Sequence, residues 1–257
     1  MNQSEKRVFL IQSLLNEQSA FQKQEIPTDS ERQKLLLRGL MNIRHPGAAK
    51  PEFLQVQDDY LRRETAEKGI TDAAGLTPIQ PGICLWQGDI TTLKCDAIVN
   101  AANSGMTGCW VPGHTCIDNC IHTFAGMQLR WECAQLMEQQ GHPEGTGLAK
   151  ITGAYNLPCK HVIHTVGPIA QGRPTPQHRL QLAQCYRSCY ELARTSGLHS
   201  IAFCCISTGL FGFPQEEAAR IAVETVMGLQ ANDPEPLDVV FNVFLDRDCE
   251  IYAELLQ

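Results

Sequence analysis

No apolar run in this chain of 257 residues approaches the ~20 residues that a helix needs to cross a membrane. The apolar patch from Val8 to Leu15 is short and is interrupted by Gln12 and Ser13, so it lacks the form of a secretory signal peptide. The chain also contains no low-complexity tract and no internal repeat. We therefore expect a globular protein without a membrane segment.

Runs of lysine or arginine are missing as well, and the charges are unevenly distributed. Residues 1–80 carry eleven basic and eleven acidic side chains, so the net charge of −7 comes from residues 81–257, which have ten basic and seventeen acidic ones. Such a region repels nucleic acids, whose binding depends largely on lysine and arginine. We expect no nucleic-acid partner, although backbone N–H groups can still hold a small phosphate-bearing ligand.

Cysteine, in contrast, is abundant, with twelve residues. Several of them, such as Cys185, Cys189, Cys204 and Cys205, fall on apolar strand-like or helix-like patterns, where a free cysteine behaves as a small hydrophobe. Disulfides persist mainly in oxidising compartments. The pattern favours a reduced, cytoplasmic protein in which clustered cysteines bind a metal.

The hydrophobic periodicity divides the chain into a helical N-terminal extension over residues 1–80 and an α/β domain over 81–257 with a largely parallel sheet, joined by a linker near Thr77–Gly82. Helices are predicted near 5–18, 30–43, 51–68, 117–139 with a break at Gly126, 176–195, 213–230 and 248–256, and strands at 84–87, 97–99, 161–166, 200–206 and 239–245. In such sheets, ligands bind beyond the carboxyl ends of the strands.

One segment after a predicted strand concentrates metal ligands: Cys109, His114 and Cys116 follow in the spacing Cys-x4-His-x-Cys. This is not a zinc-finger spacing, and no Cys-x2-Cys pair lies nearby. Structural zinc sites have four protein ligands, whereas catalytic ones keep three and an open position, which these residues match. The alternative is that the cysteines merely pack and His114 is a loop residue. Cys120 and His122 are weaker candidates.

A second segment, Ile206–Pro214, contains Ser207, Thr208, Gly209, Leu210, Phe211 and Gly212 at a strand-to-helix junction. Its glycines allow the backbone to approach an anion, and the helix that follows offers unpaired N–H groups and the positive end of its dipole. Asp89, after the first strand of the domain, is suited to accept a hydrogen bond from an exocyclic amine or to cap a turn. His164 is expected to be a core histidine.

Together these segments resemble the macrodomain family. The ordered matches are Gly88–Thr91, Asp96–Asn103, Ile117–Asp118, Ile121–His122, Leu157–Pro158, Val162–Pro168 and Ile206–Pro214, and they cover residues 82–257. Where hydrolytic macrodomains have a run of glycines, this chain has the longer segment Thr107–Cys116. That departure resembles the zinc-dependent branch, whose members remove mono-ADP-ribose from proteins. The resemblance implies a three-layer α/β/α fold that binds ADP-ribose.

The resemblance also implies roles for single residues. Asp89 and Ile90 would hold the adenine, residues 207–212 the diphosphate and Asn103 the distal ribose. One Zn²⁺ per chain would sit on Cys109, His114 and Cys116, and Asp118 would orient or deprotonate water. The expected substrate is a mono-ADP-ribosylated protein with an Asp or Glu linkage, and a lipoyl-carrier protein is the first candidate.

Three alternatives remain open at this point. The protein could be a reader that binds ADP-ribose without chemistry, because the phosphate loop and Asp89 serve both functions. It could act on a small metabolite such as O-acetyl-ADP-ribose. Finally, the zinc could be purely structural, with Cys120 or His122 as a fourth ligand.

Overall fold

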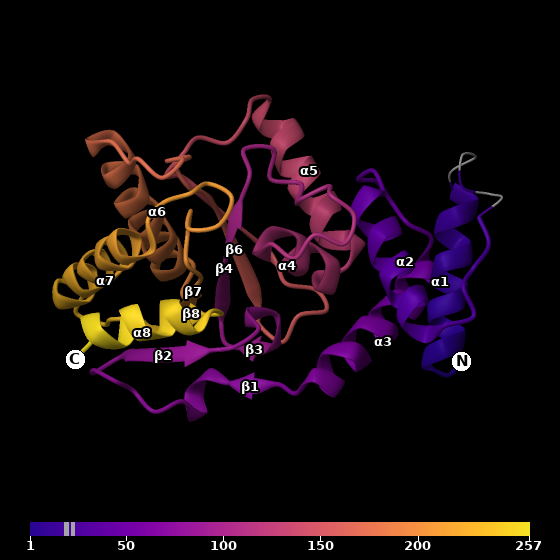
Figure 1. Cartoon of the computed structure of the whole chain (residues 1–257), viewed down its shortest axis with the longest axis horizontal. Coiled ribbons are helices and arrows are strands. Elements are labelled where there is room, and N and C mark those ends of the chain that lie inside the picture. The colour runs from indigo at the N-terminus through magenta and orange to yellow at the C-terminus, as the bar shows by residue number, and fades with distance from the viewer. Residues whose placement is uncertain (18–20, 22–23) are drawn as a thin grey trace.

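The N-terminal extension forms a helical layer at one end of the molecule, shown in indigo in the computed structural model of Figure 1, which describes residues 1–17, 21 and 24–257. Its helices are α1 (Gln3–Glu17), α2 (Ser30–Ile43) and α3 (Pro51–Lys68). This confirms the predicted helices, although residue 18 lies outside the described residues. Asp29 caps α2 by accepting a hydrogen bond from the Arg32 amide, and Pro51 opens α3.

The main sheet of the domain has, within the described residues, six strands in the order β2-β8-β7-β4-β6-β5. The strands are β2 (Ile83–Gln87), β4 (Ala97–Ala102), β5 (Ala149–Gly153), β6 (His161–Val166), β7 (Ser200–Phe203) and β8 (Asp238–Val243). Neighbouring strands are parallel except for β5, which runs antiparallel to β6. The predicted mixed, largely parallel sheet is therefore confirmed.

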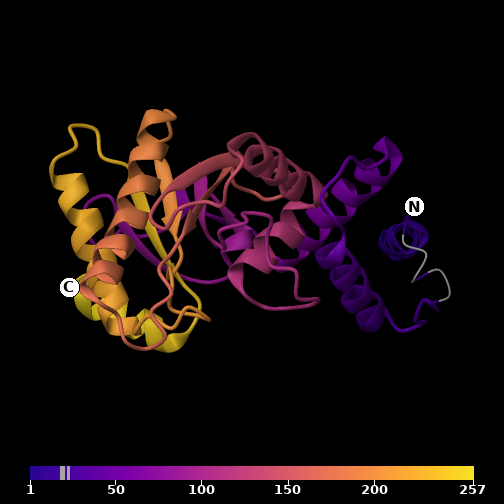
Figure 2. The same ribbon diagram turned by 90° about the horizontal axis from the view of Figure 1, so that it is seen from above.

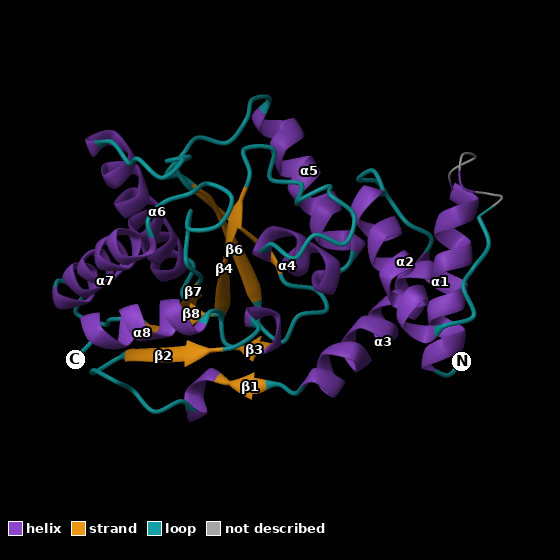
Figure 3. Ribbon diagram, in the orientation of Figure 1, coloured by secondary structure: helices purple, strands orange, loops and turns teal. Residues whose placement is uncertain are grey.

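Helices cover both faces of this sheet and produce the predicted three layers (Figures 2 and 3). On the side of the extension lie α4 (Ile117–Ala125) and α5 (Met127–Gln140), which pack on β4 and β5. On the opposite side, α6 (Pro176–Thr195), α7 (Gln215–Ala231) and α8 (Asp246–Leu255) pack on one another. The predicted break at Gly126 is the boundary between α4 and α5, where φ is +96°.

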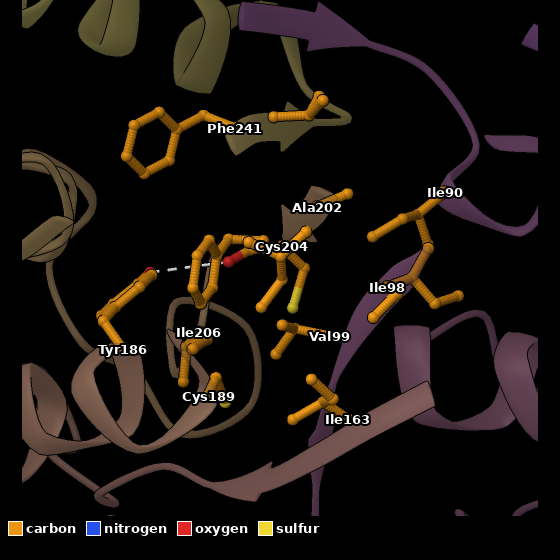
Figure 4. Packing of buried hydrophobic residues seen from close by; sticks show 14 of the residues in the cluster. Ile90, Ile98, Val99, Ile163, Tyr186, Cys189, Ala202, Cys204, Ile206 and Phe241 are labelled. Atoms are coloured by element: carbon orange, nitrogen blue, oxygen red, sulfur yellow. Dashed lines mark hydrogen bonds between the residues drawn. The ribbon is translucent and has the colours of Figure 1, made fainter. Parts of the chain in front are cut away.

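Apolar side chains of the central strands form a core between the sheet and α6 (Figure 4). Val99 and Ile163 from neighbouring strands are fully buried, as is Cys189 of α6. The Tyr186 hydroxyl lies 3.5 Å from the carbonyl oxygen of Cys204, so its polar end is satisfied. Fully burying a large apolar side chain contributes roughly 1.5–3 kcal/mol, which makes this core the rigid base for the strand ends.

Some sequence predictions were wrong in detail. The strand β5 was missed because it carries a single large apolar residue, Ile151. The strand predicted at 200–206 ends at Phe203, and the one predicted at 239–245 ends at Val243, because the apolar residues that follow belong to loops. The extension is not wholly helical either. Its strand β1 (Thr71–Asp72) pairs with β3 (Leu93–Lys94), a ladder too short to produce a sequence period.

Two hydrophobic clusters lie on either side of the predicted boundary at residue 80. One contains Leu10, Leu37 and Tyr60 and reaches Met127 of α5, and the other surrounds the main sheet. The division into residues 1–80 and 81–257 stays a prediction, because β1 and Met127 join the two parts. All twelve cysteines are free. In the described part of the chain, no helix is long and apolar enough to cross a membrane.

Candidate active site

Polar segments converge where the parallel strands end. Asp89 follows β2, Asn103 follows β4, residues 207–212 lie between β7 and α7, and Phe244 follows β8. The strand order places β2 beside β8 and β7 beside β4. The predicted ligand-binding residues therefore line one edge of the sheet, which is the expected position for a ligand site in an open α/β sheet.

Asp89 is already engaged at both carboxylate oxygens. Its Oδ1 accepts hydrogen bonds from the amide and the hydroxyl of Thr91, at 3.0 and 2.6 Å. Its Oδ2 lies 3.0 Å from the ammonium nitrogen of Lys68, the last residue of α3. Burial raises the pKa of Asp89, but the bonds from Thr91 and Lys68 outweigh it and hold that pKa below its usual range. The carboxylate is thus a fixed, ionised acceptor next to buried Ile90.

The loop at 207–212 presents backbone N–H groups without protein partners. In the described part of the chain, the amides of Thr208, Gly209, Leu210 and Phe211 donate to no protein acceptor, whereas the amide of Gly212 bonds to the Gly209 carbonyl at 2.9 Å. Ser207 adopts a left-handed φ of +67°, and its buried hydroxyl has no partner. Successive free amides ahead of the helix α7 form an anion-binding concavity. A diphosphate fits this arrangement.

A second loop supports the first. The amides of Ala170 and Gln171 donate to the Phe211 carbonyl at 2.8 and 3.0 Å, and the amide of Gly172 donates to the Gly212 carbonyl at 2.6 Å. This loop follows β6, the neighbour of β4, so it belongs to the same sheet edge. These hydrogen bonds hold the carbonyl groups of Phe211 and Gly212, and they do not use the amides of residues 208–211.

Asp118, the second residue of α4, is held by two asparagine side chains. Its Oδ1 accepts from Nδ2 of Asn100 at 2.8 Å and its Oδ2 accepts from Nδ2 of Asn103 at 3.2 Å. Asn103 also donates to the Gly108 carbonyl at 3.1 Å. Burial raises the pKa of Asp118 to about 6, against these hydrogen bonds and the charge of Arg130. A carboxylate with such a pKa is suited to exchange a proton near neutral pH.

The structure brings Cys109, His114 and Cys116 together. Their Sγ, ring-nitrogen and Sγ atoms all lie within 4.8 Å of one another, and the Cys109 Sγ is 3.8 Å from the Nδ1 of His114. Tetrahedral Zn²⁺ with Zn–S of about 2.3 Å and Zn–N of about 2.1 Å separates such atoms by about 3.6 Å. The spacing and the chemistry of the three donors therefore fit a zinc ion with one open position.

The charge state of the Cys116 thiol depends on a cation. Burial raises the pKa of Cys116 to about 12, and the nearby groups Cys109 and Asp118 act in the same direction. Without a cation the thiol stays protonated at neutral pH, and metal binding must release that proton. Metal affinity at this loop is consequently expected to increase with pH.

Neither Cys120 nor His122 belongs to this three-residue group. His122 instead lies in a buried group with Cys133 and His164. His164 is a satisfied core histidine, as predicted, since its Nδ1 is 3.1 Å from the Asn100 amide nitrogen and its Nε2 is 2.9 Å from the Thr152 hydroxyl. Because both ring nitrogens are used, the buried group does not offer three free ligand atoms. A fourth zinc ligand from His122 is not supported by this arrangement.

Sequence reasoning missed two side chains at this edge. Phe244 was placed inside a strand, but β8 ends at Val243 and leaves the residue 71% exposed. Its carbonyl oxygen lies 3.3 Å from Nε2 of Gln87 at the end of β2. An exposed aromatic ring at this edge is suited to stack on a base. Lys68 was missed because a lysine that ends a helix is normally solvated, and nothing in the sequence pairs it with Asp89.

Comparisons with known proteins found relatives that match most or all of the chain. The Macro domain family profile matches residues 99–222. The "Protein-ADP-ribose hydrolase" of Treponema medium is 54% identical over 260 residues, covering 100% of both chains. The protein of the same name from Staphylococcus aureus (strain MRSA252) is 49% identical over 250 residues, covering 96% of this chain and 93% of that one. Both matches include most or all of the N-terminal helices.

A solved structure shows the same fold. The Trypanosoma brucei macrodomain in complex with ADP-ribose matches with a TM-score of 0.67 and 30% identity, over 82% of this chain and 92% of that chain.

Proposed function

The chain belongs to the macrodomain family, among the protein-ADP-ribose hydrolases, and we propose that it removes mono-ADP-ribose from protein side chains with the help of a zinc ion. The observation that carries the zinc assignment is the group of Cys109, His114 and Cys116 beside Asn103 and Asp118. A protein that only bound ADP-ribose would need the phosphate loop and Asp89 but would have no use for three metal ligands at the distal end of the site.

ADP-ribose is proposed to lie along the carboxyl ends of the strands. Asp89 accepts a hydrogen bond from the adenine amine beside Ile90, and the ring of Phe244 stacks on the base. The free amides of residues 208–211 hold the diphosphate, with Ser207 and Gly212 shaping the turn. Asn103, at the end of β4, orients the distal ribose.

The distal ribose is proposed to lie beside the metal loop, which is the segment Gly108–Cys116 that carries Cys109, His114 and Cys116. A Zn²⁺ ion held by Cys109, His114 and Cys116 would supply Lewis acidity for polarising an oxygen of the substrate or of water. Two thiolates donate much charge, so we assign positioning and polarisation to the site rather than generation of a free hydroxide. Asp118, fixed by Asn100 and Asn103, accepts one proton of the attacking water. The water oxygen bonds to the anomeric carbon of the distal ribose while the bond from that carbon to the side-chain oxygen breaks, and the protein carboxylate leaves with the electron pair. General-base assistance of this kind contributes roughly 10²–10⁴-fold to a rate.

The substrate is proposed to be an Asp- or Glu-linked ADP-ribosyl protein. An ester of this kind has a good leaving group and needs only modest stabilisation of negative charge, which suits a metal site weakened by two thiolates. A lipoyl-carrier protein is the partner we would test first. O-acetyl-ADP-ribose shares the ADP-ribosyl part and differs only in the leaving group, so it serves as a comparison substrate.

The test combines turnover with metal analysis on three proteins: wild type, Cys116→Ser and Cys120→Ser. Cys120 lies four residues away and outside the three-residue group, so it is the matched control. We expect about one zinc per chain and release of ADP-ribose from a modified carboxylate in wild type and Cys120→Ser, and loss of both in Cys116→Ser. Activity without metal would contradict the zinc mechanism. Tight ADP-ribose binding without release in all three would make the protein a reader.

A further inference from the structure

The helix α2 of the N-terminal extension contacts the loop that carries Cys109 and His114. Two of its side chains, Arg38 and Asn42, are four residues apart and share one helix face. Nη2 of Arg38 donates to the His114 carbonyl at 2.7 Å. Oδ1 of Asn42 accepts from the Gly113 amide at 2.9 Å. The extension therefore binds the backbone of the loop at two successive residues.

Between Cys109 and His114, the loop has few internal hydrogen bonds. Val111, Pro112 and Gly113 are exposed, and the internal hydrogen bond from the His114 amide to the Val111 carbonyl is 3.2 Å long. An exposed loop with few internal hydrogen bonds opens locally at low free-energy cost. The position of His114 relative to Cys109 is thus determined mainly by contacts made from outside the loop.

The other end of the loop is linked to α2 through Arg130 of α5. Its guanidinium group donates to the carbonyl oxygens of Asn42 and Arg44 at the end of α2, and from Nη2 to the Cys109 carbonyl at 3.4 Å. The same group lies 4.5 Å from the centre of the Trp110 ring. Arg130 is buried, so these contacts are shielded from water. The positions of Cys109 and His114 are therefore both held by hydrogen bonds that lead to α2.

A third link runs through α4. Nη2 of Arg38 is also 3.1 Å from Oδ1 of Asn119, and Nδ2 of Asn119 donates to the Val111 carbonyl at 3.0 Å. Nδ2 of Asn42 donates to the Thr123 hydroxyl at 2.9 Å. The same two residues of α2 thus join the loop to the helix that carries Asp118.

We propose that Arg38 and Asn42 are positioning residues for the metal loop, and that the N-terminal extension serves the active site by holding this loop rather than by binding a separate partner. This inference rests on the proposed zinc site. Residues that orient metal ligands from outside the coordination shell typically change metal affinity by roughly 10–100-fold when they are removed. The alternative is that α2 only adds hydrophobic stability to the whole protein.

The experiment uses the full chain with Arg38→Ala, Asn42→Ala and the control Arg7→Gln. Arg7 is a buried arginine of the same extension, and its side chain bonds to Gln33 and Ser30 rather than to the loop. Zinc affinity is measured by chelator competition, the ligand geometry by the absorption spectrum of the Co²⁺-loaded protein, and loop opening by hydrogen exchange of a peptide covering residues 108–116.

We expect Arg38→Ala and Asn42→Ala to weaken zinc binding about 10–100-fold, to alter the Co²⁺ spectrum and to accelerate exchange in the 108–116 peptide. Arg7→Gln is expected to lower the melting temperature while leaving these three readouts at wild-type values. Unchanged affinity and exchange in the α2 variants, or an equal loss in Arg7→Gln, would overturn the inference. If wild type binds no zinc, the proposed function fails, and the exchange comparison still decides whether α2 holds the loop.

Discussion

The ammonium nitrogen of Lys68 lies 3.0 Å from Oδ2 of Asp89 and 3.3 Å from the centre of the Phe124 ring. Lys68 ends α3 in the N-terminal extension, whereas Asp89 is the predicted adenine ligand of the domain. Oδ1 of Asp89 accepts two hydrogen bonds from Thr91, whereas Oδ2 accepts only the one from Lys68, so Oδ2 can accept a further bond from the exocyclic amine of adenine. The lysine therefore orients the acceptor that the base needs.

Replacing Lys68 by alanine is expected to weaken ADP-ribose binding. The pair is partly exposed, with side-chain exposures of 34% and 36%, so its loss should cost about 0.2–1 kcal/mol, or up to about fivefold in Kd. Calorimetric titration measures the effect. Lys94→Ala is the control, since Lys94 forms a comparable ion pair with Asp72 and does not touch Asp89. An unchanged or tighter Kd for Lys68→Ala would show that the lysine does not assist the base.

The sequence predicted the parts of the site whose members lie close together along the chain. Cys109, His114 and Cys116 span eight residues, so little reorganisation of the chain is needed to bring them together. The central strands were predicted from adjacent apolar residues, Ile98–Val99 in β4 and Val162–Ile163 in β6, which are typical of strands buried on both faces of a sheet.

Contacts between distant residues were beyond the reach of sequence patterns. Arg38 and His114 are 76 residues apart, and a single arginine on an amphipathic helix looks the same whether it is solvated or bonded to a carbonyl. The strand β5 was missed for a related reason: its place is set by pairing with β6, and its own residues carry almost no period. The hydrophobic period of a segment indicates whether it is buried. It does not indicate which other strand or helix the segment pairs with.

Replacing Asp118 by asparagine should abolish most of the turnover. The amide cannot accept a proton, and its NH₂ group would face Nδ2 donors of Asn100 or Asn103. We expect turnover to fall by about 10²-fold or more with little change in ADP-ribose affinity. Asp96→Asn is the control, because Asp96 bonds to the amides of His199 and Ser200 and should affect only stability. Full turnover by Asp118→Asn would remove this residue from the mechanism.

Ser207→Gly should raise stability and weaken ligand binding. The left-handed φ of +67° costs a residue other than glycine about 1–2 kcal/mol, and the buried hydroxyl lacks a protein partner. The substitution removes the backbone strain and the unpaired hydroxyl, and it increases the conformational entropy of the unfolded chain. We expect the first two effects to be larger, so the melting temperature should rise by about 2–4 °C. A hydroxyl that serves the phosphates would make Kd for ADP-ribose rise at the same time.

The control for Ser207→Gly is Gln171→Gly, which relieves a similar left-handed φ of +49° and keeps the Ser207 hydroxyl. It should gain stability without a change in affinity. If Ser207→Gly binds ADP-ribose as tightly as wild type, the hydroxyl has no part in phosphate binding.

The last prediction compares two glycines of the metal loop. Gly108 has a φ of +81°, and a Cβ there would lie 2.7 Å from the buried ring of His122, whereas Gly113 has a φ of +68° and open space around it. Alanine at either position must adopt a left-handed backbone conformation, which destabilises the folded protein by about 1–2 kcal/mol. Only Gly108→Ala must also move the loop away from the ring of His122. We expect Gly108→Ala to lose zinc as well as stability, and Gly113→Ala to lose stability alone, measured by metal content and thermal unfolding. Equal zinc loss in both variants would show that backbone strain, rather than the contact with His122, sets the position of Cys109.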